Sequence, residues 1–319
     1  MSEKKISDEI VMESAACPNG CNVGDKIILR GRDTLHSIGG DYFVVKCLAC
    51  GLMRTDPRPD FNSIGKFYPE NYAPYKNLSF KKSKKTGILK TIVDFIFRFN
   101  DNLLPLSPPG KLLEVGCASG VYLNDRLLDG WQVEGVEFSE SAVNVAREHG
   151  MRVHHGQIKD IQLENAPYDI VVAQMVLEHL YNPVAELKEW RKLIKPGGKL
   201  VISVPNINSL DFYLFKQYWY GLQLPTHLFH FTPQTLTNVL LNSGWRVVRI
   251  SHQRTLASYI GSLGIYLEQR TRFSRTGRYL KDLTASGGYL PYLIYPLSLS
   301  MAALGQTGRM TIWAEPLDD

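Results

Sequence analysis

A short apolar run that ends in a glycine-bearing turn is the feature that most constrains the fold of this chain. Residues 111–115 read KLLEV, and the turn GCASG follows at residues 116–120, before a helical pattern begins. Glycines let the backbone approach a ligand closely, and the first N–H groups of the next helix can bind an anion. The pattern predicts a nucleotide-like ligand at the end of a parallel strand.

An acidic residue is expected next to the ribose of such a ligand. Glu137 comes 21 residues after Gly116, at the end of the next apolar run. A carboxylate in this place accepts hydrogen bonds from both ribose hydroxyls. A dinucleotide fingerprint needs glycines at 116, 118 and 121, but Ala118 and Val121 occupy the last two positions. Glu114 would also repel a phosphate, whereas it can help to hold a ligand that carries an ammonium group and a sulfonium.

Short apolar runs alternate with helical patterns beyond Pro109. This alternation predicts an α/β fold with a seven-stranded, mostly parallel sheet and helices on both faces. The expected strands are 111–115, 132–137, 152–155, 169–174, 199–204, 245–251 and 310–314. The clearest helices between them are 139–149 and 183–194.

Four of the five cysteines form two close pairs, Cys17 with Cys21 and Cys47 with Cys50. The first twenty residues contain no apolar run of a secretory signal, so a cytoplasmic location is expected. In a reducing compartment such pairs indicate metal ligands rather than disulfides. Two thiolates from each of two turns would complete a closed, structural zinc site, and the sequence therefore predicts a zinc ribbon within residues 1–56. Four unrelated buried cysteines are the alternative.

Residues 57–110 are expected to connect this ribbon to the catalytic domain. They are rich in proline and aromatic residues, turn basic at 81–85, and contain an amphipathic helical pattern at 87–100. That helix is expected to pack on the core, and peripheral contact with the inner membrane face is the open alternative.

The catalytic domain is expected over residues 111–319. Its aromatic-rich segment 206–231 is interpreted as a lid over the substrate, and residues 254–309 are interpreted as a helical insertion. Pro291 and Pro296 interrupt the apolar part of this insertion, so it does not form a transmembrane span. A membrane-surface patch or a subunit contact remains open for it, and so does the oligomeric state.

The strand and turn motifs resemble those of class I S-adenosylmethionine (SAM)-dependent methyltransferases, which have a Rossmann-like α/β fold. The resemblance covers residues 111–206. It rests on EVGCASG at 114–120, GVE at 135–137, YDIVVAQMVLEH at 168–179 and KPGG at 195–198. With the cysteine pairs, FYPENY at 67–72 and PTHLFHFTPQTL at 225–236, the chain is similar to bacterial zinc-ribbon methyltransferases of polysaccharide and natural-product pathways. This group has diverse acceptors, so the likeness names none.

The resemblance implies a set of residues around SAM. Gln157 stands where many relatives have an aspartate for the adenine amino group, and its carbonyl oxygen can accept the same hydrogen bond. The implied cofactor residues are Glu114, Gly116, Cys117, Ala118 and Gly120 of the turn, Glu137 and Phe138 after the second strand, Gln157 and Ile158 beside the adenine, and Gln174 beside the methionine moiety.

Glu178, His179 and His227 are the candidate catalytic residues, and three interpretations of them stay open. They could orient the loop after the fourth strand. His227 or His179 could act as a general base, because an imidazole pKa near 6.5 suits proton removal at neutral pH. They could also bind a divalent metal, as a Glu-His pair and a later His do in small-RNA 2′-O-methyltransferases, although Met175 stands where those enzymes supply a further glutamate.

The acceptor is expected to be a small molecule or a sugar or glycan, with O-methylation favoured and with contacts to Tyr72, Tyr218, Trp219 and His230. A formal net charge of +5 is too small to imply nucleic-acid binding by itself. An RNA methyltransferase that uses the ribbon and the basic run at 81–85 is one alternative. A non-catalytic SAM-fold assembly protein is the other.

Overall fold

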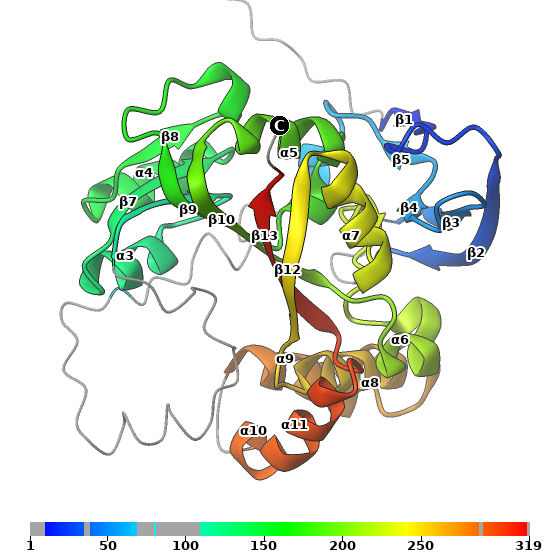
Figure 1. Ribbon diagram of the computed structural model, residues 1–319. Coiled ribbons are helices and arrows are strands. Elements are labelled where there is room, and N and C mark those ends of the chain that lie inside the picture. The colour runs from blue at the N-terminus through cyan, green and yellow to red at the C-terminus, as the bar shows by residue number, and fades with distance from the viewer. Residues whose placement is uncertain (1–9, 35–38, 69–79, 81–108, 287–289, 318–319) are drawn as a thin grey trace, which may run out of the picture.

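A computed structural model describes residues 10–34, 39–68, 80, 109–286 and 290–317. It contains a large central sheet flanked by helices and a smaller sheet formed mainly by the N-terminal residues (Figure 1). Tyr72, the basic run at 81–85 and the helix expected at 87–100 lie outside the described residues.

The central sheet has seven strands in the order β12-β13-β10-β9-β6-β7-β8. Strand β13 runs antiparallel to both of its neighbours, and the strands from β10 to β8 run parallel, so the predicted mostly parallel α/β fold is confirmed. The bounds are β6 (Lys111–Val115), β7 (Gln132–Glu137), β8 (Val153–His155), β9 (Tyr168–Gln174), β10 (Ile194–Pro205), β12 (Trp245–His252) and β13 (Arg309–Pro316). Strand β10 begins earlier than expected because the KPGG segment forms an irregularity between Ile194 and Lys199.

Helices cover both faces of this sheet because its strands are apolar on both sides. Leu112 packs in one hydrophobic cluster with α3 (Val121–Leu128) and α4 (Glu140–Glu148). Leu113, the next residue, points to the opposite face, where it joins a cluster with α5 (Pro183–Arg191) and α7 (Pro233–Asn242). Alternation along each strand thus supplies two separate apolar layers.

Capping side chains fix the starts of three of these helices. Ser139 accepts a hydrogen bond from the Ala142 amide at the start of α4, and Asn182 accepts one from Ala185 at the start of α5. Thr232 forms a reciprocal capping box at the start of α7. Each cap stabilises its helix by about 1 kcal/mol.

The N-terminal residues form a four-stranded sheet in the order β11-β4-β3-β2. Its strands are β2 (Asp25–Arg32), β3 (Asp41–Cys47), β4 (Met53–Thr55) and β11 (Phe229–His230). Strand β11 comes from the methyltransferase part of the chain, so the boundary expected at residue 56 does not separate the two sheets. We call residues 10–68 the N-terminal module.

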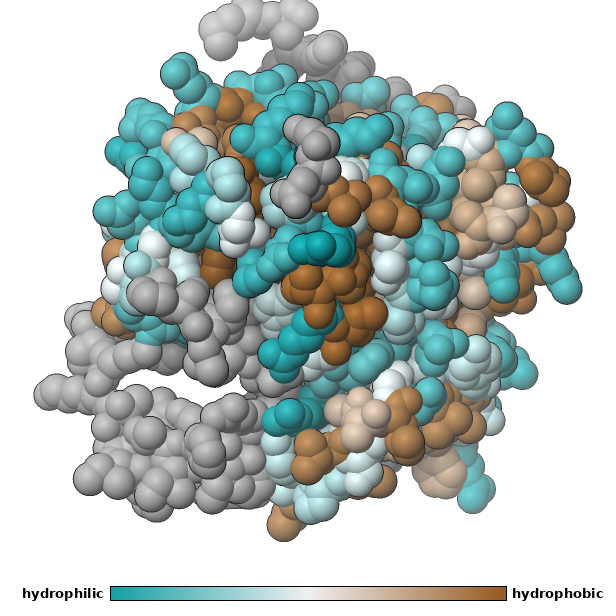
Figure 2. Space-filling view, in the orientation of Figure 1, coloured by the Kyte–Doolittle hydropathy of each residue, from teal (hydrophilic) through white to brown (hydrophobic). Residues whose placement is uncertain are grey.

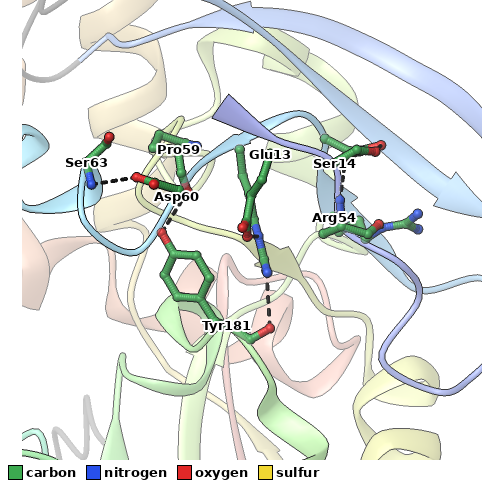
Figure 3. Close-up of polar contacts among 10 residues, drawn as sticks. Glu13, Ser14, Arg54, Pro59, Asp60, Ser63 and Tyr181 are labelled. Atoms are coloured by element: carbon green, nitrogen blue, oxygen red, sulfur yellow. Dashed lines mark hydrogen bonds and ion pairs between the residues drawn. The ribbon is translucent and has the colours of Figure 1, made fainter. Parts of the chain in front are cut away.

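A second contact joins this module to the loop after β9 (Figure 3). Strands β1 (Met12–Glu13) and β5 (Arg58–Pro59) pair beside Tyr181, whose hydroxyl donates to the Pro59 carbonyl at 2.7 Å. The Arg58 guanidinium lies 4.3 Å from the Tyr181 ring centroid, donates to the Tyr181 carbonyl and pairs with Glu13 at 2.8 Å. A short 3-10 helix, η1 (Ile64–Phe67), follows.

Part of the segment 206–231 packs against the N-terminal module. The segment contains α6 (Leu210–Phe215), a 3-10 turn η4 (Lys216–Tyr218) and β11. Trp219 is only 1% exposed, and its indole N–H donates to Asp211 at 2.9 Å. It shares an apolar cluster with Tyr42 and Phe67 of the N-terminal module. Trp219 and Phe212 therefore serve core packing, and Trp219 has no surface left for an acceptor, whereas Tyr213 is 53% exposed.

Residues 254–309 form α8 (Ala257–Arg270), α9 (Ser274–Ser286), α10 (Leu290–Leu293) and α11 (Tyr295–Ala303). These helices lie at the lower end of the molecule in Figure 1, where Figure 2 shows several hydrophobic patches. The exposed apolar side chains there include Tyr279, Leu293, Leu297 and Leu304. Among the described helices, none combines the length and the apolar character needed to span a bilayer.

A substitution at Leu52 tests whether the two sheets share one hydrophobic core. It lies in the N-terminal module, yet it is fully buried in the cluster that contains Leu113 and Trp190. We expect Leu52→Ala to lower the free energy of unfolding of the whole chain by about 2–5 kcal/mol, measured by urea denaturation. Leu48→Ala is the matched control, because Leu48 is 59% exposed and its truncation should change this free energy by less than about 0.5 kcal/mol. Equal effects of the two substitutions would contradict a shared core.

Candidate functional site

The glycine turn after β6 forms the first wall of the site. Gly116 and Gly120 have φ values of +68° and +82°, which favour glycine, and Ala118 is held at +46°. A side chain at Gly116 would collide with Val176, so the turn lies directly against the loop after β9. Helix α3 begins at Val121 with Gly120 as its N-cap and no side-chain cap. The first N–H groups of α3 can therefore bind an anionic group of a ligand.

Glu137, at the end of β7, is held in one orientation by two backbone amides. Its Oε2 accepts a hydrogen bond from the Ala118 amide at 2.9 Å, and its Oε1 accepts one from Ser139 at 2.8 Å. Each carboxylate oxygen keeps a further lone pair. The carboxylate can therefore accept from two adjacent hydroxyls, such as those of a ribose.

The carboxyl group of Glu114 is buried, and one of its two oxygens accepts no hydrogen bond. Its Oε1 accepts from the Gln174 side chain at 3.2 Å, whereas Oε2 has no hydrogen-bond partner. Burial raises the pKa of Glu114 to about 8. The hydroxyl of Tyr122, in the first turn of α3, also has no hydrogen-bond partner. A ligand with polar donor groups would satisfy such buried atoms, and this observation fits SAM at the turn.

Two of the expected cofactor residues, Phe138 and Ile158, follow the ends of β7 and β8, and Cys117 of the turn serves packing. Phe138 follows Glu137, is 62% exposed and contacts Phe61 edge-to-face at 5.8 Å. Ile158 is buried at the start of the 3-10 helix η2 (Ile158–Asp160), directly after Gln157. Cys117 is buried against Gly135, and burial raises the pKa of its thiol. Its thiol therefore fills space under the turn and does not act as a nucleophile.

His179 and His227 come from distant segments but lie edge-to-face, with ring centroids 4.7 Å apart. His179 is in the 3-10 helix η3 (Leu177–His179), which follows β9. Its Nδ1 lies 2.9 Å from the Thr226 carbonyl, and Nδ1 of His227 lies 2.9 Å from the Gly221 carbonyl. A carbonyl oxygen can only accept, so both Nδ1 atoms carry the hydrogen. In this neutral tautomer each Nε2 carries a lone pair in place of a hydrogen.

Glu178 completes this group and is fully buried. Neither of its carboxylate oxygens has a hydrogen-bond partner in another residue, although its own backbone amide and the charge of Arg309 both favour the ionised form. Burial raises the pKa of Glu178 to about 8, lowers that of His179 to about 4 and lowers that of His227 well below its usual range. One ligand atom from each of Glu178, His179 and His227 lies within 4.8 Å of the others. We call these three residues the Glu-His-His cluster.

The remaining residues expected at the acceptor have other contacts. His230 is buried, and its Nε2 lies 3.2 Å from the Thr55 hydroxyl, so it faces the N-terminal module. Burial lowers the pKa of His230 to about 3. Tyr218 is half-buried and packs edge-to-face on Tyr266 of α8, with centroids 5.6 Å apart. Trp219 belongs to the core, as described above.

Two non-glycine residues with positive φ, Ala118 and Met175, lie at the site. The described non-glycine residues with positive φ are Ala118, Met175, Lys216 and Gln223. Ala118 lies in the glycine turn, Met175 follows β9 directly, and the other two lie in the 206–231 segment. Such conformations cost of order 1–3 kcal/mol each and concentrate where ligands bind.

The four paired cysteines converge in the N-terminal module. Their sulfur atoms lie within 4.8 Å of one another, and Sγ of Cys17 is 3.5 Å from Sγ of Cys50. A tetrahedral site with Zn–S bonds of about 2.3 Å requires sulfur atoms roughly 3.8 Å apart, which fits this cluster. Burial opposes ionisation of Cys50, but N–H groups of Asn19 and Leu52 lower the pKa of this thiol to about 7.

The family model described as "Methyltransferase domain" matches residues 90–250, which is half of the 319-residue chain. The chain belongs to this methyltransferase family. It is 32% identical over 130 residues to a ubiquinone biosynthesis O-methyltransferase of Coxiella burnetii, a match that covers 39% of this chain and 53% of that protein. The protein of the same description from Aromatoleum aromaticum is 30% identical over 119 residues, with 35% and 48% covered. The chain thus spans about half the length of these relatives.

Among solved structures, the chain is similar to an S-adenosylmethionine-dependent methyltransferase from Mesorhizobium loti. The two are 16% identical, with a TM-score of 0.42, and the match covers 66% of this chain and 93% of that one.

Gly116 and Gly150 provide a matched test of the turn. Both have positive φ, but only Gly116 has a neighbour in the way of a side chain. Substitution by alanine should cost about 1–2 kcal/mol of folding free energy at either site because of the left-handed backbone. At Gly116 the collision with Val176 should add about 1–3 kcal/mol. Urea denaturation measures both variants, and equal losses would show that the turn and the loop after β9 are not in contact.

Proposed function

We propose that this chain is a SAM-dependent methyltransferase that transfers a methyl group to an oxygen of a small-molecule or glycan acceptor. The observation that carries the proposal is the Glu137 carboxylate, which backbone amides orient beside the glycine turn and the open end of α3. Membership of the methyltransferase family supports the same reaction class.

The residues around the turn divide the binding of SAM among them. Amides at the start of α3 would bind the carboxylate of the methionine moiety, and Glu114 with Gln174 would meet its ammonium group. Glu137 would accept from the ribose hydroxyls, and Phe138 and Ile158 would enclose the adenine. Bound SAM would supply a methyl group on a positively charged sulfur. A nucleophile in line with the carbon–sulfur bond attacks the methyl carbon, and the sulfur is the leaving group.

The Glu-His-His cluster is the proposed acceptor side. Glu178 and His179 of this cluster follow β9, Glu178 four residues after Gln174, and the buried Glu178 and His227 offer polar groups to a hydroxyl nucleophile. An acceptor hydroxyl must lose its proton as the new bond to carbon forms. The cluster would orient that hydroxyl or assist the loss of its proton. The ubiquinone biosynthesis O-methyltransferases named above support an oxygen acceptor.

We also propose that Cys17, Cys21, Cys47 and Cys50 bind one zinc ion. Four thiolates close the coordination sphere, so the ion would stabilise the N-terminal module and take no part in methyl transfer. The sulfur spacing and the Asn19 side chain, which donates to Cys50 at 3.4 Å, support this assignment.

Glu137→Ala tests the cofactor half of the proposal. Hydrogen bonds to a charged group contribute about 1.5–3 kcal/mol each, so the loss of two should weaken SAM binding by about 100-fold or more. Isothermal titration calorimetry of the full-length chain measures this affinity. Glu140→Ala removes an exposed carboxylate three residues away and should leave the affinity unchanged. Equal affinities of the Glu137→Ala variant and the wild type, or no SAM binding by the wild type, would contradict the proposal.

A further inference from the structure

We propose that Arg309 binds an anionic group of the methyl acceptor, so that the acceptor carries a carboxylate or a phosphate in addition to its reactive hydroxyl. The geometry points to this because Arg309 lies beside the Glu-His-His cluster, in an open hollow, without a close partner for its charge. The inference rests on the proposed methyl transfer and adds a substrate class to it.

The backbone places Arg309 at the edge of the central sheet where the acceptor side begins. Arg309 is the first residue of β13 and pairs with Pro205, the last residue of β10. Strand β10 runs parallel to β9, and the Met175 amide, directly after β9, donates to the Ser203 carbonyl at 2.8 Å. The start of β13 therefore lies at the same edge as the loop after β9, which carries Glu178.

Electrostatic interactions place three polar side chains near the Arg309 guanidinium. Burial dominates the pKa values of Glu178 and His227, and the positive charge of Arg309 lowers both. The Tyr220 hydroxyl acts on the charge of Arg309 in turn. Such interactions weaken with distance, so Arg309 shares the acceptor side with the Glu-His-His cluster.

The side chain of Arg309 is reached by solvent and is also surrounded by protein. It is exposed, yet burial lowers the pKa of its guanidinium from the usual value. A guanidinium on an open convex surface keeps its hydration, and burial then has little effect on its pKa. The two observations together describe a side chain in an open hollow, which a ligand can enter.

The charge of Arg309 has no close partner. Within the described ranges, its guanidinium forms no hydrogen bond or ion pair with another residue. Glu178 is fully buried, and neither of its oxygens has a hydrogen-bond partner in another residue, so these two groups do not pair. A charge that has lost part of its hydration is costly without a partner. An anionic group of a ligand would supply that partner.

The guanidinium selects the class of ligand. Its planar fork of N–H groups matches two oxygens of a carboxylate or a phosphate at once, and it stays charged at physiological pH. Tyr220 can add a further donor, since its amide is bound to the Ser262 hydroxyl at 2.9 Å and its ring packs on Gly261. A neutral acceptor would displace water from Arg309 without neutralising its charge, so it would bind less tightly.

The backbone around Arg309 is fixed from two sides. The Asn206 amide donates to the Gly308 carbonyl at 3.0 Å, and the Gln253 amide donates to the Arg309 carbonyl at 3.1 Å. Side chains on such rigid elements position a ligand precisely. An acceptor held by its anion on Arg309 would therefore present its hydroxyl to the Glu-His-His cluster in one orientation.

Inorganic phosphate and acetate are the probes, because they represent the two kinds of anionic group. The full-length chain is first saturated with SAM, so that the start of α3, which can also bind an anion, is occupied. Each probe is then titrated at constant ionic strength, and binding is followed by the line width of the phosphorus resonance or of the carboxyl carbon resonance of labelled acetate. We expect saturable binding of at least one probe, and the probe with the higher affinity indicates the group that the acceptor carries.

Arg309→Gln should weaken this binding about 10-fold or more, because hydrogen bonds to a charged group are lost. Arg309→Lys keeps the charge without the planar fork, so its affinity should lie between those of Arg309→Gln and the wild type. Arg275→Gln is the matched control, because it removes an exposed arginine from α9, away from the acceptor side, and its affinity should equal that of the wild type.

Urea denaturation of each variant shows whether it folds, and Arg309→Lys provides the comparison if Arg309→Gln does not. No saturable binding of either probe by the wild type would overturn the proposal. So would equal affinities of the wild type and the folded Arg309 variants.

The SAM affinity of the wild type separates this inference from the proposed function. A chain that binds a probe through Arg309 but does not bind SAM would retain the anion site and refute the methyltransferase function. A chain that binds SAM, but whose affinity for both probes is unaffected by the Arg309 substitutions, would do the reverse.

Discussion

The pairing of β4 with β11 is the interaction on which the arrangement of the site depends. Phe229 and His230 lie opposite Arg54 and Met53, so a strand of the methyltransferase part completes the sheet of the N-terminal module. Beside this pair, the Thr55 amide donates to the Leu228 carbonyl at 3.0 Å. The backbone that carries His227 is therefore held by the N-terminal module.

The two halves of the site consequently have different supports. The cofactor half is formed by the ends of β6, β7 and β9, where Glu137 and the glycine turn are held by bonds within the central sheet. The acceptor half needs contacts from the N-terminal module, through Thr55 to the segment after Gln223 and through Tyr68 to His179. The N-terminal module, which looks separate in the sequence, thus packs as a structural part of the methyltransferase fold.

The sequence predicts the central sheet well because each strand is a short apolar run with a turn on either side. Glu137 could also be placed, since its distance from the glycine turn is set by one crossover helix. The Glu-His-His cluster follows from position relative to β9 together with the resemblance.

The contacts that the sequence misses are those with no local pattern. Strand β11 has only two residues and pairs with a strand more than 170 positions earlier. A segment this short has no hydrophobic periodicity from which it could be predicted. The aromatic residues near Trp219 suit either a lid or a core, and the buried bond to Asp211 places Trp219 in the core. Tyr122 was also missed, although its position in the first turn after the glycine motif was a usable signal.

Hydrogen–deuterium exchange of the full-length chain and of a Cys47→Ser variant tests most directly whether the N-terminal module supports the acceptor half. The substitution removes one of the four clustered thiols and should loosen the module. We predict faster amide exchange in residues 17–56 and also in 176–181 and 223–231, with no change in the glycine turn at 114–120. Faster exchange confined to residues 17–56 would contradict this dependence.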